Sequence, residues 1–170
     1  MKDIDLPQVA VDIKKWGREL GFQQVGIADI DPGGSEDRLM AWLEQGRMGE
    51  MDYMIRYGVK RARPAELVPG TQRVVSVRMD YLPEDQGRLH ERLENPTTAF
   101  ISRYALGRDY HKLMRNRLKR LADRITTEIG PCGHRAFVDS APVLEKALAQ
   151  NAGLGWIGKH TNLINDRAGA

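Results

Sequence analysis

Two segments of the chain gather side chains that can carry acid–base chemistry. Residues 102–111, SRYALGRDYH, place a hydroxyl, guanidinium groups, phenols and an imidazole around one turn. Asp139 follows a short apolar run at 136–138 and precedes Pro142. It therefore lies at an expected strand-to-helix junction, where α/β proteins place reactive groups. Capping is the alternative role, because Asp139 or Ser140 could satisfy free N–H groups at the start of that helix.

A third segment, GLGWIG at 153–158, is rich in glycine and is followed by Lys159 and His160. It satisfies the G-x-G-x-x-G pattern of dinucleotide-binding loops. That pattern requires a strand before it and a helix after it, whereas here we expect a helix before it and a strand after it. We interpret the segment as a loop whose backbone N–H groups can approach a ligand closely, with a plain surface loop as the alternative.

Basic residues are concentrated in two blocks, although the formal net charge is only +3. Residues 1–55 hold 6 basic and 11 acidic side chains, whereas residues 101–124 hold 8 basic and 2 acidic ones. The other basic block lies within 56–78. On a helix, three residues of the 101–124 block share one face: Lys112, Arg115 and Lys119. This asymmetry favours a polyanionic partner, and a solvated helix face is the alternative.

The elements that position these groups follow from the apolar periodicity and from turn residues. Helical spacing predicts helices over 7–20, 35–46, 49–56, 110–129 and 142–151, with Asp109 as a cap for the fourth. Apolar and β-branched runs predict strands over 22–28, 73–79, 100–104, 136–138 and 161–165. Residues 83–98 are expected to form a helical turn flanked by loop, and 64–70 an irregular crossing. Alternating helices and strands favour an α/β fold.

Length and composition limit the class of protein. A chain of 170 residues is expected to form a single domain. One cysteine, Cys132, excludes an intramolecular disulfide and cannot supply four thiolates to an iron–sulfur cluster. No uncharged stretch approaches the roughly 20 residues that span a bilayer. We therefore expect a soluble cytoplasmic protein with no membrane partner.

The same segments carry a resemblance to a known family. SRYALGRDYH at 102–111, FVDSAPVLE at 137–145 and GLGWIGKH at 153–160 resemble the amino-terminal half of epoxyqueuosine reductase, in order and at matching intervals. RARP at 61–64 and LVPG at 67–70 also fit. The resemblance covers nearly the whole chain. It implies reduction of the epoxide of epoxyqueuosine to queuosine at the wobble position of a tRNA anticodon, with cobalamin and two [4Fe–4S] clusters.

The resemblance also implies a fold and a division of labour. Residues 1–170 are expected to form the cobalamin-binding domain, an α/β fold similar to nitroreductases and reductive dehalogenases, with a central sheet flanked by helices. The ferredoxin-like domain that carries the clusters in the family is not in this chain, whose single thiol cannot replace it. We expect the chain to bind cobalamin and tRNA, and to turn over only with electrons from an external donor.

By resemblance, Asp139 is the expected proton donor to the alkoxide that forms when the epoxide opens. Because an exposed aspartate is ionised at neutral pH, this role predicts that Asp139 is buried against the corrin face. The expected cofactor contacts are Arg61, Arg63, Ser102, Gly155, Gly158, Lys159 and Asn162. The expected contacts with substrate or tRNA are Tyr104, His111, Lys112, Arg115 and Lys119. We expect no protein ligand to a metal ion.

Two other functions fit the residues. A flavin-binding oxidoreductase with a nitroreductase-like fold would keep the fold and change the cofactor, and the visible spectrum distinguishes the two cofactors. A tRNA-binding module without a cofactor would account for the basic blocks but not for Asp139 at its junction.

Overall fold

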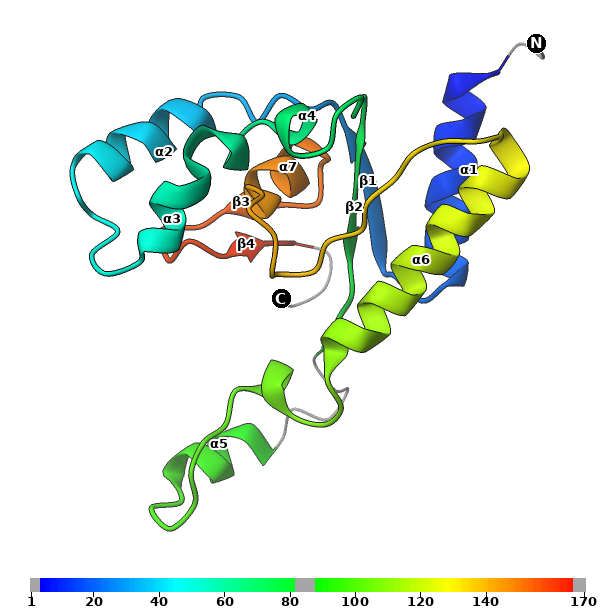
Figure 1. The fold of residues 1–170 in the computed structure, drawn as a ribbon. Coiled ribbons are helices and arrows are strands. Elements are labelled where there is room, and N and C mark those ends of the chain that lie inside the picture. Colours follow the sequence, from blue (N-terminus) through cyan, green and yellow to red (C-terminus); the bar gives the residue numbers. More distant parts are fainter. Residues whose placement is uncertain (1–3, 82–87, 167–170) are drawn as a thin grey trace.

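The computed structural model describes residues 4–81 and 88–166 and has a mixed α/β fold (Figure 1). Its centre is an antiparallel pair of strands, β1 (Gln24–Ala28) and β2 (Val74–Arg78), in which Gly26 lies opposite Ser76. Both strands were predicted, because their β-branched residues suit a packed, pleated surface. The α/β class is confirmed, although the central sheet has two strands in the part of the chain that the structure describes.

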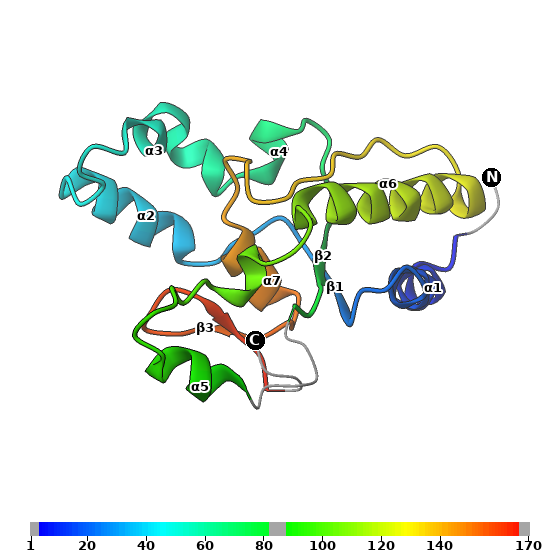
Figure 2. The same ribbon diagram turned by 90° about the horizontal axis from the view of Figure 1, so that it is seen from below.

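Three helices cover the two faces of this sheet. α1 (Leu6–Glu19) and α6 (Tyr110–Ile129) lie together on one side, and α7 (Glu145–Asn151) lies on the other (Figures 1 and 2). The core between α1, α6 and the sheet consists of five buried side chains: Ile13, Trp16, Phe22, Val25 and Leu121. The predicted helical periodicity in α1 and α6 is confirmed, because both present one apolar stripe to this core.

A second group of short helices packs at the far end of the sheet, beyond α7 (Figure 2). It contains α2 (Ser35–Glu44), α3 (Asp52–Tyr57), the 3-10 helix η1 (Gly58–Arg61) and α4 (Pro64–Leu67). The first two were predicted. The last was not, because residues 64–70 were expected to be irregular; Pro64 in the first turn fits a helix start instead.

A second antiparallel pair, β3 (Trp156–Ile157) with β4 (Leu163–Ile164), follows α7. β4 lies within the strand predicted at 161–165, but β3 occupies a segment that was predicted to be a loop. The strand prediction at 136–138 is wrong, since no ladder forms there. An apolar run of three residues has no partner strand at that position, and pairing rather than propensity decides.

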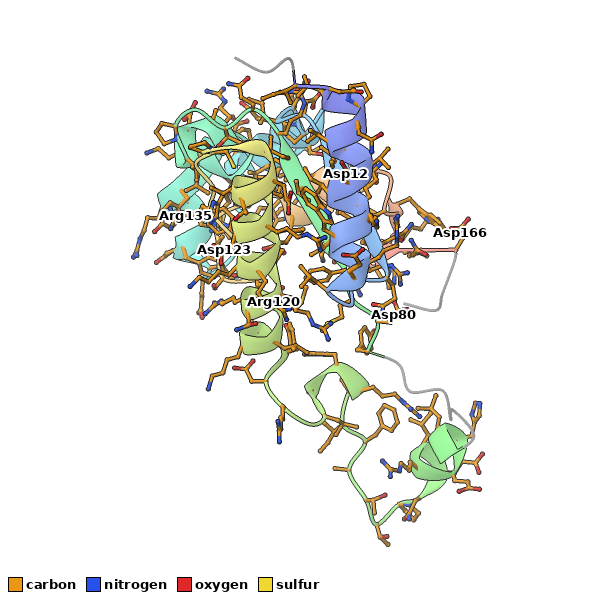
Figure 3. The ribbon with its side chains drawn as sticks, turned by 90° about the vertical axis from the view of Figure 1, so that its right-hand side faces the viewer. Asp12, Asp80, Arg120, Asp123, Arg135 and Asp166 are labelled. Carbon is orange, nitrogen blue, oxygen red and sulfur yellow. The ribbon has the colours of Figure 1, made fainter. Side chains whose placement is uncertain are left out.

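Residues 88–109 form an arm that projects from the rest of the molecule (Figures 1 and 3). The arm contains α5 (Arg88–Glu94), which confirms a helical turn within the predicted 83–98 segment; residues 83–87 lie outside the described part. The strand predicted at 100–104 is wrong, because the arm has a 3-10 helix, η2 (Arg103–Ala105), there. Among the described residues, no helix combines the length and apolarity that a bilayer crossing requires.

Candidate active site

Asp139 is held by two side chains from the first turn of α6. The hydroxyl of Tyr110 donates a hydrogen bond to Oδ2 of Asp139, and Nε2 of His111 lies 3.1 Å from the same oxygen. Asp139 has φ of 56°, in the left-handed region that residues other than glycine rarely adopt. Backbone held in such a conformation is typical of functional sites.

The first turn of α6 is itself organised by Asp109. Its Oδ1 accepts from the backbone N–H of His111 at 3.0 Å, which confirms the predicted N-cap. The same oxygen lies 2.8 Å from Nδ1 of His111. The His111 side chain, by this hydrogen bond, holds the pKa of Asp109 below its usual value. The His111 ring therefore has a carboxylate at each nitrogen.

Tyr110 stacks on His111 with 4.2 Å between the ring centroids. Its hydrogen bond to Asp139 raises the pKa of Tyr110 to about 12, with burial as a second cause. The phenol therefore stays protonated at neutral pH and acts as a donor. Tyr104, on the arm, packs edge-on against the Tyr110 ring, with 6.4 Å between the ring centroids. The arm therefore contacts the site at this point.

In the chain alone the Asp139 side chain is 52% exposed, so the burial predicted for it would have to come from the corrin face. The carboxyl lies in the bend that precedes α7, in which Asp139 and Ser140 are the exposed residues. The capping alternative fails, because the N-cap position of α7 is Leu144 and no side chain caps it. Ser140 instead accepts from Nη2 of Arg115 at 3.0 Å. Desolvation, followed by repulsion from Asp139, raises the pKa of the neighbouring Glu145.

The beginning of α7 brings together segments that are distant in the sequence. The backbone N–H of Leu144 donates to the carbonyl of Arg61 at 2.9 Å. Nζ of Lys146 donates to the carbonyl of Thr161 at 2.7 Å and lies 3.5 Å from Oδ1 of Asn162. The segment that carries Asp139, the end of η1 and the β3–β4 turn therefore meet at one end of α7.

Arg61 is the buried cation of this region, with 9% of its surface exposed. Its Nη2 donates to the carbonyl of Tyr53 at 2.9 Å, and its Cζ lies 5.6 Å and 5.9 Å from the ring centroids of Tyr53 and Tyr57. Its Nε is buried without a hydrogen-bond partner, and no carboxylate in the described part of the chain pairs with it. A buried charge without a counterion is costly, so this guanidinium suits an anionic or strongly accepting ligand.

Two of the residues predicted to contact a cofactor lie in other surroundings. The guanidinium of Arg63 pairs with Glu36 at 2.6 Å and with Glu66 at 2.9 Å. Ser102 is exposed on the arm, immediately before η2. Contacts of these two residues with a ligand stay predictions.

The glycines of the 153–158 segment have a packing role. A Cβ at Gly155 would clash with the carbonyl oxygen of Ile164, and one at Gly158 would lie 2.6 Å from Cδ1 of Ile164. Both glycines thus allow the β3–β4 pair to form. Lys159 and Asn162 are exposed at the turn between these strands, where a ligand can reach them.

The basic residues of α6 fall into two groups. Nη1 of Arg117 donates to the carbonyl of Gly21 at 2.9 Å, and Arg124 pairs with Glu19 at 2.6 Å, so both hold α6 against the α1 segment. The remaining basic side chains include three exposed ones on the predicted face: Lys112, Arg115 and Lys119. Figure 3 shows Arg120 and Asp123 on the same helix.

The structure shows a cavity of about 430 Å³ elsewhere, lined among others by Lys14 and Arg18 of α1 and by Gly153. Asp139 does not line it. Around Asp139, Tyr110 and His111 are half-buried, whereas Asp139 and Ser140 are exposed, so a ligand can reach the carboxyl from solvent.

Sequence reasoning did not single out Tyr110 as a contact of Asp139. It also did not assign roles to Glu145 or Lys146. The signal for Tyr110 was available, because it belongs to the dense 102–111 segment. Contacts made by Glu145 and Lys146 depend on how α7 packs, which local sequence does not show.

Comparisons with known proteins agree with the resemblance seen in the sequence. A family described as "Epoxyqueuosine reductase QueG, DUF1730" matches residues 61–140. An epoxyqueuosine reductase of Pseudomonas aeruginosa is 63% identical over 98% of this chain and 46% of its own length. The structure of epoxyqueuosine reductase from Streptococcus thermophilus has a TM-score of 0.74 and 26% identity, over 94% of this chain and 42% of that one.

A further solved structure, of an epoxyqueuosine reductase with a tRNA-Tyr epoxyqueuosine-modified stem loop, has a TM-score of 0.73. At 20% identity, over 97% of this chain and 43% of that chain, it shows the fold alone. Together, the fold and the sequence matches relate the chain to part of the epoxyqueuosine reductases. The chain belongs to the epoxyqueuosine reductase family. It spans less than half the length of the curated relatives it matches.

Proposed function

We propose that the chain is the cobalamin-binding domain of an epoxyqueuosine reductase, and that Asp139 delivers the proton to the epoxide oxygen. The single observation that carries this proposal is the buried guanidinium of Arg61, which lacks a counterion and lies at the same end of α7 as the Asp139 segment. The family membership supplies the reaction, reduction of epoxyqueuosine to queuosine in tRNA.

The residues at this end of α7 suit a corrinoid, whose periphery carries amides and a phosphodiester. Arg61 supplies a buried cation for an anionic group, while Lys159 and Asn162 supply exposed polar groups at the β3–β4 turn. When bound, cobalamin supplies the electrons for the reduction. The electrons reach it from an external donor or from clusters held outside this chain, because four cluster thiolates are not available here.

The residues of α6 orient the acid. Tyr110 and His111 both contact Oδ2 of Asp139, which holds the carboxyl in place while its side chain stays 52% exposed. An alkoxide is a strong base, and its departure from carbon is easier when an acid protonates it in the transition state. Tyr104 lies at the arm side of this surface and is placed to line the substrate side.

A cobalamin titration followed by visible spectroscopy tests the proposal. We expect a saturable spectral change with one cobalamin per chain, and none with a flavin. Binding of flavin instead would support the nitroreductase-like alternative. Binding of tRNA with no response to either cofactor would favour the cofactor-free module and overturn the proposal.

We also propose that the basic face of α6, formed by Lys112, Arg115 and Lys119, binds the tRNA backbone. Its three exposed positive charges attract the negatively charged phosphates. The tRNA stem loop seen with a relative of the same fold supports this. Changing Lys112, Arg115 and Lys119 to Gln is expected to lower the salt slope of tRNA binding by about 2–3, because each neutralised phosphate contributes about 0.7–0.9. Filter binding at several salt concentrations measures this slope.

A matched triple variant on α1, with Lys14, Lys15 and Arg18 changed to Gln, serves as the control. It removes the same charge from another exposed helix face. An equal loss in both triple variants would show a general effect of net charge and would contradict a specific α6 contact.

A further inference from the structure

A carboxyl that is half open to water is ordinarily ionised at neutral pH and is then no acid. The exposed position of Asp139 therefore leaves the source of the proton open. The groups that face Asp139 and its partner His111 come from three parts of the fold. Asp109 and Tyr110, at the start of α6, contact them directly, and Glu145 on α7 interacts with Asp139. One step further out, Lys112 acts on Asp109, Arg115 donates to Ser140, and Tyr104 on the arm meets Tyr110.

The proton count at His111 follows from its two contacts. Oδ1 of Asp109 already accepts the backbone N–H of His111, and it also lies 2.8 Å from Nδ1. An ionised carboxylate only accepts, so Nδ1 carries a proton. At the other nitrogen, Nε2 and Oδ2 of Asp139 are 3.1 Å apart. This contact is a hydrogen bond only when one proton lies between them, on the ring or on the carboxyl.

We propose that His111 and Asp139 act as one acid that shares a single proton between Nε2 and Oδ2, and that Asp109 is the positioning residue that keeps the other ring proton on Nδ1. This inference rests on the proposed function, since it names the source of the proton that Asp139 delivers. Tyr110 donates to the same Oδ2 and stacks on the ring, which fixes their relative orientation.

The proton transfer balances. The Nε2–H bond breaks as an O–H bond forms at Oδ2 of Asp139, and that O–H bond then breaks as the same proton passes to the alkoxide oxygen, where the final O–H bond forms. The ring is left neutral, with its remaining proton on Nδ1 facing Asp109. Because the His111 side chain is 36% exposed, water can return a proton to the ring after each turnover.

The tautomer of neutral His111 tests the inference on the chain itself, without turnover. We expect ring-nitrogen NMR at mildly alkaline pH to show the proton on Nδ1 as the major form. Asp109→Ser keeps a good N-cap but is too short to reach the ring, so the Nε2–H form should become the major one. The other histidines, His90, His134 and His160, serve as internal controls, and His111→Gln assigns the signal.

The inference is overturned if His111 has the same tautomer with and without the Asp109 carboxylate. A second variant, Asp109→Asn, keeps the cap and the size of the side chain while removing its charge. In a form of the protein that turns over, it should lower kcat by about 100-fold with KM unchanged, since correct acid–base assistance is worth about 10²–10⁴. An unchanged kcat would also overturn it.

The outcomes for the shared proton and for the proposed function are separate. A chain that binds cobalamin but shows no tautomer change retains the proposed function and loses the role of Asp109. A chain that shows the tautomer change but binds no corrinoid keeps the coupled pair and loses the cofactor.

Discussion

Asp139→Asn is expected to lower the rate of epoxide reduction by about 10²- to 10⁴-fold, the usual worth of a general acid, while cobalamin binding stays unchanged. The amide has nearly the same shape and still accepts from Tyr110 through its oxygen, but it cannot pass a proton to the substrate. Single-turnover assays on tRNA carrying epoxyqueuosine, in a form that contains the iron–sulfur domain, measure the rate. The cobalamin titration measures binding.

Asp123→Asn is the matched control for this change. Asp123 is another exposed aspartate, labelled on α6 in Figure 3, and its substitution removes the same charge without touching the site. If Asp139→Asn kept full activity, the acid would be a different group and the proposed role of Asp139 would be wrong. If both variants lost activity equally, the effect would come from net charge.

The parts of this fold that sequence could predict are those fixed by local periodicity. α1 and α6 follow from apolar residues at helical spacing, and the Asp109 cap follows from a carboxylate immediately before the first turn. The strands predicted at 100–104 and 136–138 did not form. A strand is stabilised by its neighbour, and neither apolar run has one in the described part of the chain.

The segments that form the site could be predicted from the sequence, but their arrangement in space could not. The spacing of Asp109 and His111 places both in one turn, yet Asp139 is 28 residues further along than His111. Only the packing of the segment before α7 against α6 brings them together. The burial of two groups was not available from the sequence: Asp139 is open to solvent, whereas Arg61 is enclosed by η1 and α3. Residue type alone predicts neither, because arginine is rarely found fully buried.

Arg61→Met is expected to weaken cobalamin binding by about 10- to 100-fold, equivalent to roughly 1.5–3 kcal/mol for a hydrogen bond to a charged group. Methionine has a similar length and fills the space between Tyr53 and Tyr57 without the charge. Since removing a buried charge that has no counterion relieves a desolvation cost, the free energy of unfolding without cobalamin should stay the same or rise. Cobalamin titration and urea unfolding measure the two quantities.

The opposite directions of these two effects separate a binding role from a structural one. If Arg61 only held the η1 segment in place, the variant would lose stability and affinity together, because the contact with the carbonyl of Tyr53 would be lost without any compensating gain. Arg56→Met is the control, since it removes an exposed arginine from α3 and should change neither quantity. Unaltered cobalamin affinity in Arg61→Met would leave the buried guanidinium without a ligand, and the cofactor assignment would lose the contact on which it rests.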